Sequence, residues 1–344
     1  ADSKGGTVKR GVVTSIAFAL AGGVLMILEA IFQPKHLAYA WHAAATFGLT
    51  LTLGGFLVGA VLVNAGAKWS ATLRHVHSAV GGALPVACLA FIPILHVSDE
   101  IALDVACLVV AVAFEETFRA AQLRDKKRAG VGAVGLVIVS ILMTLFFFDV
   151  TLAPARPWVS DMFGLYVLVG SFGAGVGATA LVGALAASTF QVTQGQSSAW
   201  GRIELVATCL WGYCAFSLYM LIWVADMPRE VSFFVPRTAY AWGWMSTVLV
   251  FGRFVVPFML LVPRAPKQHW WHVGAMGALM VVVHALDCEM MVGPSSASSP
   301  SWLDFGCFFV VGGVLSLVAM LRFRRHAPLP AAREVEVALA YEGS

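Results

Sequence analysis

Charged residues are scarce in this chain of 344 residues. Asp, Glu, Lys and Arg make up 12% of the sequence, whereas hydrophobic residues make up 59%. A soluble domain carries roughly 25% charged residues, because they cover its surface. Most of the surface of this protein must therefore face an apolar environment. The small formal net charge of +3 gives no indication of a nucleic-acid partner.

Closely spaced cysteines are also missing. The six cysteines lie in apolar segments, and none belongs to a Cys-x-x-Cys pair: Cys88, Cys107, Cys209, Cys214, Cys288 and Cys307. An iron–sulfur cluster or a structural zinc ion requires a tightly spaced set of ligands. We therefore expect these cysteines to be small buried residues, and we expect no metal ion or cluster bound directly by this chain.

Apolar segments long enough to cross a membrane are abundant. A spanning helix needs about 20 mostly apolar residues. Ten such segments occur, at 11–33, 38–63, 75–97, 101–121, 131–153, 162–188, 202–225, 237–263, 270–292 and 302–322. They predict an all-α polytopic membrane protein with about ten transmembrane helices. Only short loops, an N-terminal segment at 1–10 and a tail at 326–344 remain, which leaves no room for a soluble catalytic domain.

The ends of the chain lie outside these segments. We expect the tail 326–344, which is rich in Pro, Ala and Glu, to be disordered. The first apolar segment is not followed by a small-residue cleavage pattern, so we expect a retained helix rather than a cleaved signal peptide.

The distribution of Lys and Arg predicts the orientation. Cytoplasmic loops of membrane proteins carry an excess of these residues. If the N-terminus is cytoplasmic, 17 of the 22 Lys and Arg residues fall in inner segments. Only Lys35, Arg156, Arg229 and Arg237 fall in outer loops, and Arg253 lies within a span. Both termini are therefore predicted to be cytoplasmic.

Two parts of the chain match each other. The second span contains Phe-Gly-Leu at 47–49 and a glycine-rich segment at 55–60, and the sixth span contains Phe-Gly-Leu at 163–165 and a glycine-rich segment at 170–175. The matching spans are four helices apart, so they run in the same direction. This predicts two parallel four-helix bundles related by an axis along the membrane normal. The alternative is chance, because small residues are common in membrane helices that pack closely.

The predicted repeat divides the chain into segments. The two bundles comprise spans 2–5 and spans 6–9. The segments are the cytoplasmic N-terminus 1–10, a peripheral helix at 11–37, the first bundle at 38–161, the second bundle at 162–301, a peripheral tenth helix at 302–325 and the tail 326–344. Asp149, which precedes Pro154, and Asp287, which precedes Pro294, are matching carboxylates of the two bundles.

Ionisable residues inside membrane spans are costly and are candidates for function. Arg253 lies well inside the eighth span. A guanidinium cannot lose its proton, so it must pair, reach water or bind an anionic group. The alternative is that Arg253 extends to the nearby inner surface.

His284 and Asp287 are three residues apart in the ninth span and share a helix face. A carboxylate beside an imidazole can orient it and stabilise its charge, which suits the acceptance of a proton. The alternative is a local pair that ties helices together. For Asp149, at the outer end of the fifth span, the alternative is a carboxylate that reaches the outer water.

Further candidates lie near the ends of spans. Glu115 and Glu116, near the inner end of the fourth span, precede Arg119 at helical spacing. They form either an interfacial salt bridge or an inner entry site for protons. His42 and His96, near the outer ends of the second and third spans, are either interfacial residues or parts of a protonatable rim.

Two stretches resemble a known family. Residues 146–164 read FFFDVTLAPARPWVSDMFG, and residues 218–230 read LYMLIWVADMPRE. Both resemble the ActF-type membrane subunit of alternative complex III, which belongs to the NrfD/polysulfide-reductase membrane-subunit family. His-Ala-Leu-Asp at 284–287, followed by a Ser/Pro-rich loop and by Asp-Phe-Gly at 304–306, is similar as well. The resemblance covers roughly residues 40–322.

The resemblance implies a function for the chain. It implies an integral membrane subunit of a respiratory complex that oxidises quinol and passes electrons to cytochrome c or an oxidase. In such a complex this subunit would act as a scaffold and a proton route. The candidate residues for the proton path or a quinol site are Asp149, His284, Asp287, Arg253, His96, His42, Glu115, Glu116 and Asp226.

The resemblance also implies partners and a location. The expected partners are a homologous quinol-binding membrane subunit, an iron–sulfur subunit, multi-haem cytochrome subunits, lipids and a terminal oxidase. Haems and iron–sulfur clusters are expected on those partners, and only quinone or quinol is expected at this chain. The implied location is the bacterial inner membrane. Two alternatives are a secondary transporter with its site between the two bundles and a purely structural anchor.

Overall fold

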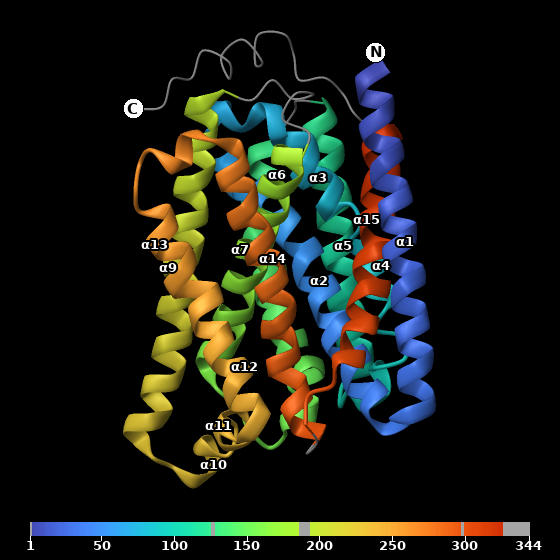
Figure 1. Ribbon diagram of the computed structural model, residues 1–344, viewed down its shortest axis with the longest axis vertical. Helices are drawn as coiled ribbons and strands as arrows, with labels where there is room; N and C mark the ends of the chain where they lie inside the picture. Colours follow the sequence, from blue (N-terminus) through green and yellow to red (C-terminus); the bar gives the residue numbers. More distant parts are fainter. Residues whose placement is uncertain (1, 125–127, 186–192, 297–298, 326–344) are drawn as a thin grey trace.

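The computed structural model describes residues 2–124, 128–185, 193–296 and 299–325 (Figure 1). Within these ranges, helix is the only regular secondary structure. The tail 326–344, which the sequence predicts to be disordered, lies outside the described residues, as do Lys126 and Lys127, which follow the fourth predicted span.

The helices follow one another along the whole chain. The longer ones are α1 (Asp2–Phe32), α2 (Pro34–Asn64), α5 (Ile101–Arg124), α6 (Arg128–Phe146), α7 (Asp161–Leu185), α9 (Gln194–Ala225), α12 (Tyr240–Val250), α14 (Trp270–Val292) and α15 (Phe305–Arg325). The shorter α-helices are α3 (Arg74–Gly81), α4 (Leu84–Leu89), α10 (Pro228–Val231), α11 (Phe234–Thr238) and α13 (Val256–Leu261). Short 3₁₀ and π turns lie between them: η1 (Lys68–Leu73), η2 (Leu95–Val97), η3 (Phe147–Thr151), η4 (Ala153–Ala155), η5 (Phe251–Val255), η6 (Pro266–Gln268), η7 (Gly293–Ser296) and η8 (Trp302–Asp304).

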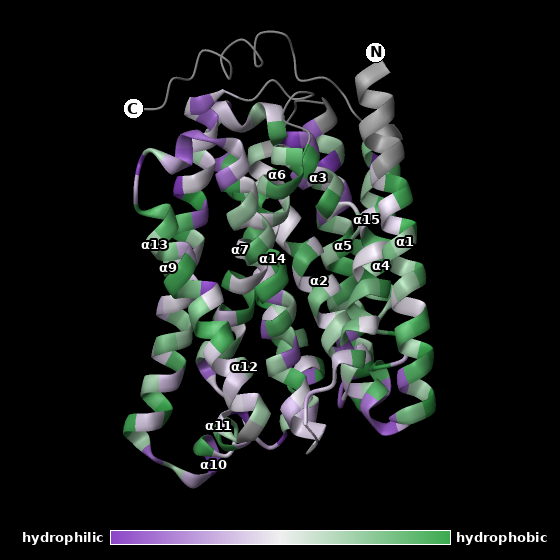
Figure 2. Ribbon diagram, in the orientation of Figure 1, coloured by the Kyte–Doolittle hydropathy of each residue, from purple (hydrophilic) through white to green (hydrophobic). Residues whose placement is uncertain are grey.

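Eight helical segments among the described residues are long and apolar enough to cross a membrane. They are Gly11–Phe32, Pro34–Asn64, Ala129–Thr151, Asp161–Leu185, Gln194–Ala225, Ala241–Leu261, Trp270–Ser296 and Trp302–Phe323. Apolar residues dominate the middle of the molecule, and hydrophilic residues gather toward its two ends (Figure 2). The chain is therefore an all-α protein with membrane-spanning helices.

The third predicted span, 75–97, is not one continuous helix. It forms α3, α4 and η2, joined by turns. Gly81 and Gly82 are adjacent poor helix formers, and Pro85 and Pro93 remove backbone donors and clash with the preceding turn. The apolar composition predicted the length of this span but not these interruptions.

The fourth predicted span, 101–121, lies within helix α5. At 1.5 Å per residue its 24 residues extend about 36 Å, enough to cross a bilayer. Asp104, Glu115, Glu116 and Arg119 make it less apolar than the eight segments above. Helix α5 is therefore long enough to cross a membrane, but it contains more charged residues than the eight segments above.

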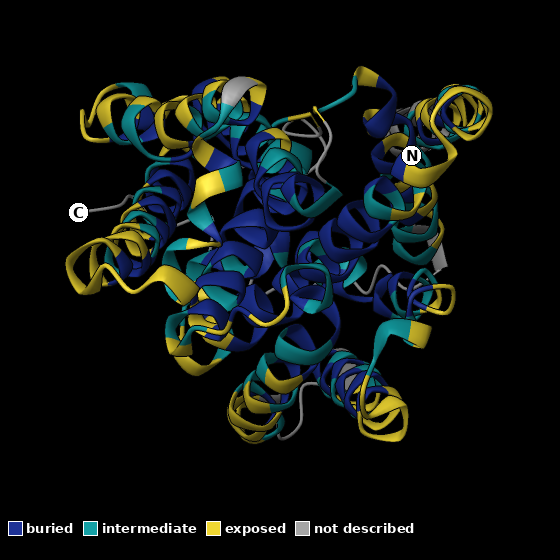
Figure 3. Ribbon diagram, turned by 90° about the horizontal axis from the view of Figure 1, so that it is seen from below, coloured by how far each residue is buried: buried dark blue, intermediate teal, exposed yellow. Residues whose placement is uncertain are grey.

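Three helices form the centre of the molecule. In the most apolar part of each helix, 83% of the residues of α2, 67% of those of α7 and 61% of those of α14 are buried, compared with 11% for α1. Seen along the helices, buried segments gather in the middle and exposed segments lie around them (Figure 3). Helix α1 packs mainly against α15, and α15 also contacts α2.

The other helices pack in two groups around this centre. Helix α2 contacts α3, α4 and α6, and α5 contacts α4 and α6. Helix α9 contacts α7, α13 and α14, and α12 contacts α14. Helices α2 and α7, which carry the matching glycine-rich segments of the sequence, pack against each other.

Glycines allow the closest of these contacts. A Cβ atom added to Gly54 of α2 would lie 2.8 Å from the backbone nitrogen of Gly175 in α7. A Cβ atom added to Gly177 of α7 would lie 2.8 Å from the carbonyl oxygen of Gly277 in α14. Small residues permit such backbone approach between membrane helices. At these two points the backbones of the central helices meet without an intervening side chain.

Two π turns interrupt long helices. One is η3, which ends α6 and contains Asp149, and the other is η5, which joins α12 to α13 and contains Arg253. Single π turns inside helices occur frequently at functional sites. Both of these carry residues that the sequence selects as candidates.

Candidate functional site

Asp287 of α14 lies at the centre of a buried polar site and is 1% exposed. The hydroxyl of Tyr166, from α7, donates a hydrogen bond to its Oδ1 atom. The indole Nε1–H of Trp211, from α9, donates to its Oδ2 atom at 3.1 Å. Each carboxylate oxygen thus has a donor from a different helix, so three helices fix the position of this group.

Arg253 also contacts Trp211. Its guanidinium carbon is 5.5 Å from the centre of the indole ring, within the range of a cation–π interaction. Its Nη1 atom donates to the carbonyl of Met280 and its Nη2 atom to the carbonyl of Gly170, both at 3.1 Å. With 2% of its surface exposed, Arg253 does not extend to the inner surface of the molecule.

His284 faces a different helix from Asp287. Its Nε2 atom forms a hydrogen bond of 2.8 Å with Thr50 Oγ1 of α2, and its buried Nδ1 atom has no hydrogen-bond partner. The carboxylate and imidazole were expected to pair, but the described hydrogen bonds of the two lead to separate partners. Residues three apart are offset by roughly 60° around a helix axis, and here that offset directs them to opposite neighbours.

We refer to Asp287, Tyr166, Trp211, Arg253, His284 and Thr50 as the buried polar cluster. It combines one carboxylate, one guanidinium and a neutral indole that contacts both. Two donors stabilise the ionised carboxylate, and a buried charge without such partners would be costly. The unpartnered His284 Nδ1 provides a position where a proton can be held or exchanged. The arrangement therefore suits proton handling inside the helix bundle.

Asp149, the predicted match of Asp287, has a different environment. It lies in η3 and is half-buried near the predicted outer end of the molecule. It accepts hydrogen bonds from Ser98 Oγ at 3.0 Å and from the backbone N–H of Asp99 at 3.1 Å, and it forms an ion pair with Arg156. Asp149 therefore organises an outer loop, and its described hydrogen bonds and ion pair do not reach the buried polar cluster.

The two predicted inner glutamates differ from each other. Glu116 forms ion pairs with Arg119 and with Arg322 of α15, the latter at 2.5 Å. Glu115 is 2% exposed, and its Oε2 atom has no hydrogen-bond partner. The salt bridge is thus formed by Glu116, whereas Glu115 is a buried carboxyl group beside it.

The remaining candidates lie apart from the cluster. His42 is buried beside Phe91, and its Nε2 atom has no hydrogen-bond partner. His96 is exposed and binds the carbonyl of Pro93 at 2.8 Å. Asp226 is exposed and ends α9 in a left-handed conformation with φ 47°, which Asp tolerates better than most residues. The described hydrogen bonds connect none of the three to the buried polar cluster.

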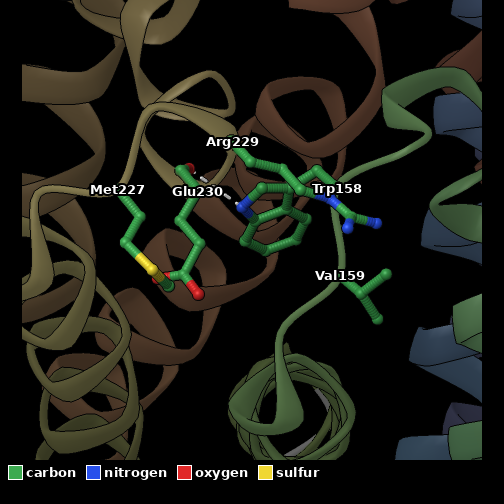
Figure 4. A pocket seen from close by; sticks show the side chains of 5 residues that line it. All are labelled: Trp158, Val159, Met227, Arg229 and Glu230. Atoms are coloured by element: carbon green, nitrogen blue, oxygen red, sulfur yellow. Dashed lines mark hydrogen bonds between the residues drawn. The ribbon is translucent and has the colours of Figure 1, made fainter.

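A pocket of about 430 Å³ lies near the predicted outer end (Figure 4). It is lined by Trp158, Val159, Met227, Arg229 and Glu230. Trp158 Nε1 donates to the carbonyl of Glu230 at 3.0 Å, and Arg229 Nη2 donates to the carbonyl of Pro157 at 3.1 Å. The two stretches that carry the family resemblance, 146–164 and 218–230, therefore meet at this pocket.

The sequence did not single out half of the buried polar cluster. Tyr166, Trp211 and Thr50 are neutral residues that are common in membrane helices, so nothing in their spacing marks them as partners of Asp287 or His284. Glu29 was also missed, although it is an isolated carboxylate within the first span and could have been selected by the rule that selected Arg253. It lies in a separate group of buried polar residues with His36 and Asp304.

No family model matches this chain, and no curated protein is similar to it at a significant level.

Proposed function

We propose that this chain is the membrane subunit of a quinol-oxidising respiratory complex similar to alternative complex III, where it serves as scaffold and proton route. The electron acceptor would be cytochrome c or an oxidase. Haems and iron–sulfur clusters would be carried by partner subunits, and the complex would lie in a bacterial inner membrane with both termini of this chain cytoplasmic.

The buried polar cluster is the observation that carries this proposal. Asp287 and His284 are ionisable groups at membrane depth, and both are fully enclosed by helices. Membrane proteins rarely keep such groups unless they serve ion or proton movement. The cluster connects α2, α7, α9 and α14, so a proton held there could move between the two groups of helices.

Two further observations support it. The stretches that resemble the ActF-type subunit lie side by side at the predicted outer end, where partner subunits would dock. We also propose that the two groups of helices are the four-helix bundles 38–161 and 162–301, related by duplication. The direct packing of α2 against α7, the helices with matching glycine-rich segments, supports this arrangement.

A secondary transporter is the second candidate. Transporters often contain interrupted helices near the substrate site. The interruption between α3 and α4 is of this kind, since Gly81, Gly82 and Pro85 break one predicted span. Under this proposal, the site would lie between the two bundles, and the charge of Arg253 would attract an anionic substrate.

Purification in mild detergent separates the two candidates. Mass spectrometry of co-purifying chains and visible spectroscopy should detect multi-haem and iron–sulfur subunits if the first proposal holds. A homo-oligomer without such partners that mediates solute uptake in vesicles would contradict it and support the transporter.

Asp287→Asn tests the role of the cluster. The amide cannot hold the proton, so we expect quinol turnover or proton translocation to fall about tenfold or more, while the complex still assembles. Asp161→Asn is the matched control, because Asp161 is an exposed carboxylate at the start of α7 and lies outside the cluster. If Asp287→Asn leaves both rates unchanged in an assembled complex, Asp287 only packs the helices.

A further inference from the structure

A second group of buried ionisable residues lies at the predicted outer end, away from the buried polar cluster. Glu29 near the end of α1, His36 in the first turns of α2 and Asp304 in η8 meet there. His36 Nδ1 lies 2.8 Å from Asp304 Oδ1 and 3.8 Å from Glu29 Oε1. One nitrogen or oxygen atom from each residue falls within 4.8 Å of the others. Segments far apart in the sequence thus bring three potential metal ligands together.

These ligands are enclosed rather than solvated. Glu29 is 0%, His36 5% and Asp304 2% exposed. Glu29 Oε1 faces His36 but has no hydrogen-bond partner. A buried carboxylate oxygen with no donor is unfavourable unless a cation or a proton satisfies it. Glu29 therefore indicates an additional positive group at this position.

A third buried carboxyl group near these ligands adds to the need for a neutralising cation or proton. Glu289 of α14 is 2% exposed, neither of its carboxylate oxygens has a hydrogen-bond partner, and it interacts electrostatically with Asp304 and Glu29. Among the described ion pairs, neither Lys nor Arg pairs with any of these carboxylates. One imidazole thus faces three buried carboxyl groups, which have to be neutralised either by bound protons or by a cation.

Other contacts hold the ligands in orientation. The backbone N–H of Ser301 donates to Asp304 Oδ2 at 2.9 Å, which leaves Oδ1 directed toward His36. His36 Nε2 lies 3.3 Å from Ser296 Oγ, so its Nδ1 atom is the one presented to the carboxylates. Metal-binding histidines commonly have their second ring nitrogen fixed by a hydrogen bond in this way.

We propose that Glu29, His36 and Asp304 bind one divalent transition-metal ion, with Zn²⁺ or Mn²⁺ as the fitting class. An imidazole nitrogen with two carboxylate oxygens is a donor set that suits these ions. Glu289 lies outside the ligand set. The ion ties the outer ends of α1 and α15 to the start of α2, and it joins the peripheral helix pair to the central helices.

Metal content tests the proposal directly. The detergent-purified chain, or the complex that contains it, is treated with a chelator, dialysed against Zn²⁺ and then against buffer, and assayed by elemental mass spectrometry. We expect about one Zn²⁺ per copy of this chain, additional to any metal of partner subunits. Glu29→Gln and Asp304→Asn should each lower this Zn²⁺ at least tenfold, while Glu204→Gln, a matched change at another buried glutamate, should retain it.

Stability provides a second measurement if a carboxylate variant does not fold. Zn²⁺ should raise the unfolding temperature of the chelator-treated wild type and of Glu204→Gln, but not that of His36→Gln. The proposal is overturned if the wild type retains no Zn²⁺, or if Glu29→Gln and His36→Gln bind as much as the wild type. Neither measurement depends on quinol turnover, so failure here is distinguishable from failure of the proposed function.

Discussion

At the scale of single residues, the buried polar cluster separates its two charges instead of pairing them. Trp211 contacts both groups: its N–H donates to the carboxylate of Asp287, and its ring face lies toward the guanidinium of Arg253. Arg253 is satisfied by two backbone carbonyls and Asp287 by two neutral donors. A direct buried salt bridge would hold both groups in fixed ionisation states. Here the hydrogen bonds of Asp287 come from neutral donors, which can be removed individually, while Arg253 acts on it without a direct ion pair.

Tyr166→Phe removes one of these donors without changing the shape of the ring. We expect a loss of about 1–3 kcal/mol in the free energy of unfolding, because a buried carboxylate oxygen loses its hydrogen bond. Unfolding by a denaturing detergent in mixed micelles measures this change. Tyr213→Phe is the control, because Tyr213 is exposed on α9. Equal stabilities for the two variants would show that the Tyr166 hydroxyl contributes nothing to the cluster.

The charged members of the cluster could be predicted from the sequence, and their partners could not. Arg253, His284 and Asp287 are conspicuous because ionisable residues are rare in apolar segments. The chain contains 11 Trp and 6 Tyr, and only the rotation of α7 and α9 about their axes determines which of them reach Asp287. That rotation depends on contacts between helices, which a single sequence does not record.

At the scale of helices, backbone contact between glycines determines how α2, α7 and α14 meet. Without a strong hydrophobic driving force inside lipid, helices associate through close packing. The sequence predicted most helices within a few residues, because apolar length is a direct signal. For the span 75–97 the apolar composition predicted one continuous helix. Gly81, Gly82 and two prolines divide this segment into shorter helices.

Gly175→Val should disrupt the contact between α2 and α7. Its side chain would collide with the backbone of Gly54, which cannot move without displacing the central helix. We expect a loss of about 3 kcal/mol in stability and a lower yield of folded protein, measured by size-exclusion chromatography in detergent. Gly23→Val is the matched control, because a Cβ atom at Gly23 of α1 meets no other atom within 4 Å. Wild-type behaviour of Gly175→Val would contradict the proposed helix crossing.

At the scale of the whole molecule, hydrophilic residues gather at two ends of an apolar body (Figure 2). Helix α1 begins at one end, and α10 and α11 lie at the opposite end (Figure 1). The bias of Lys and Arg predicts which end faces the cytoplasm. The number of crossings and this orientation remain predictions, which labelling from one side of the membrane can test.

Two exposed positions allow that labelling. Ser232, which follows α10, can be replaced by cysteine at one end of the molecule. Gln268 of η6, in the connection between α13 and α14, can be replaced by cysteine at the other end. We expect a membrane-impermeant maleimide to label Ser232→Cys but not Gln268→Cys in spheroplasts, and to label both after permeabilisation. The parent protein, which has its six native cysteines, provides the background. Labelling of both variants before permeabilisation would contradict the predicted topology.

The packing of α1 against α15 has a consequence for biogenesis. Helix α1 is synthesised before α15, yet α15, the last of the described helices, is its main partner. At about 5–20 residues per second, roughly 15–55 s of translation separates the two. During this interval lipid or the insertion machinery must hold α1 in the membrane. Its Glu29 side chain lacks the neighbouring Asp304 until η8 is synthesised. Release of a ribosome stalled before α15 would therefore leave α1 without its main packing partner, and we expect membrane quality-control proteases to recognise such a chain.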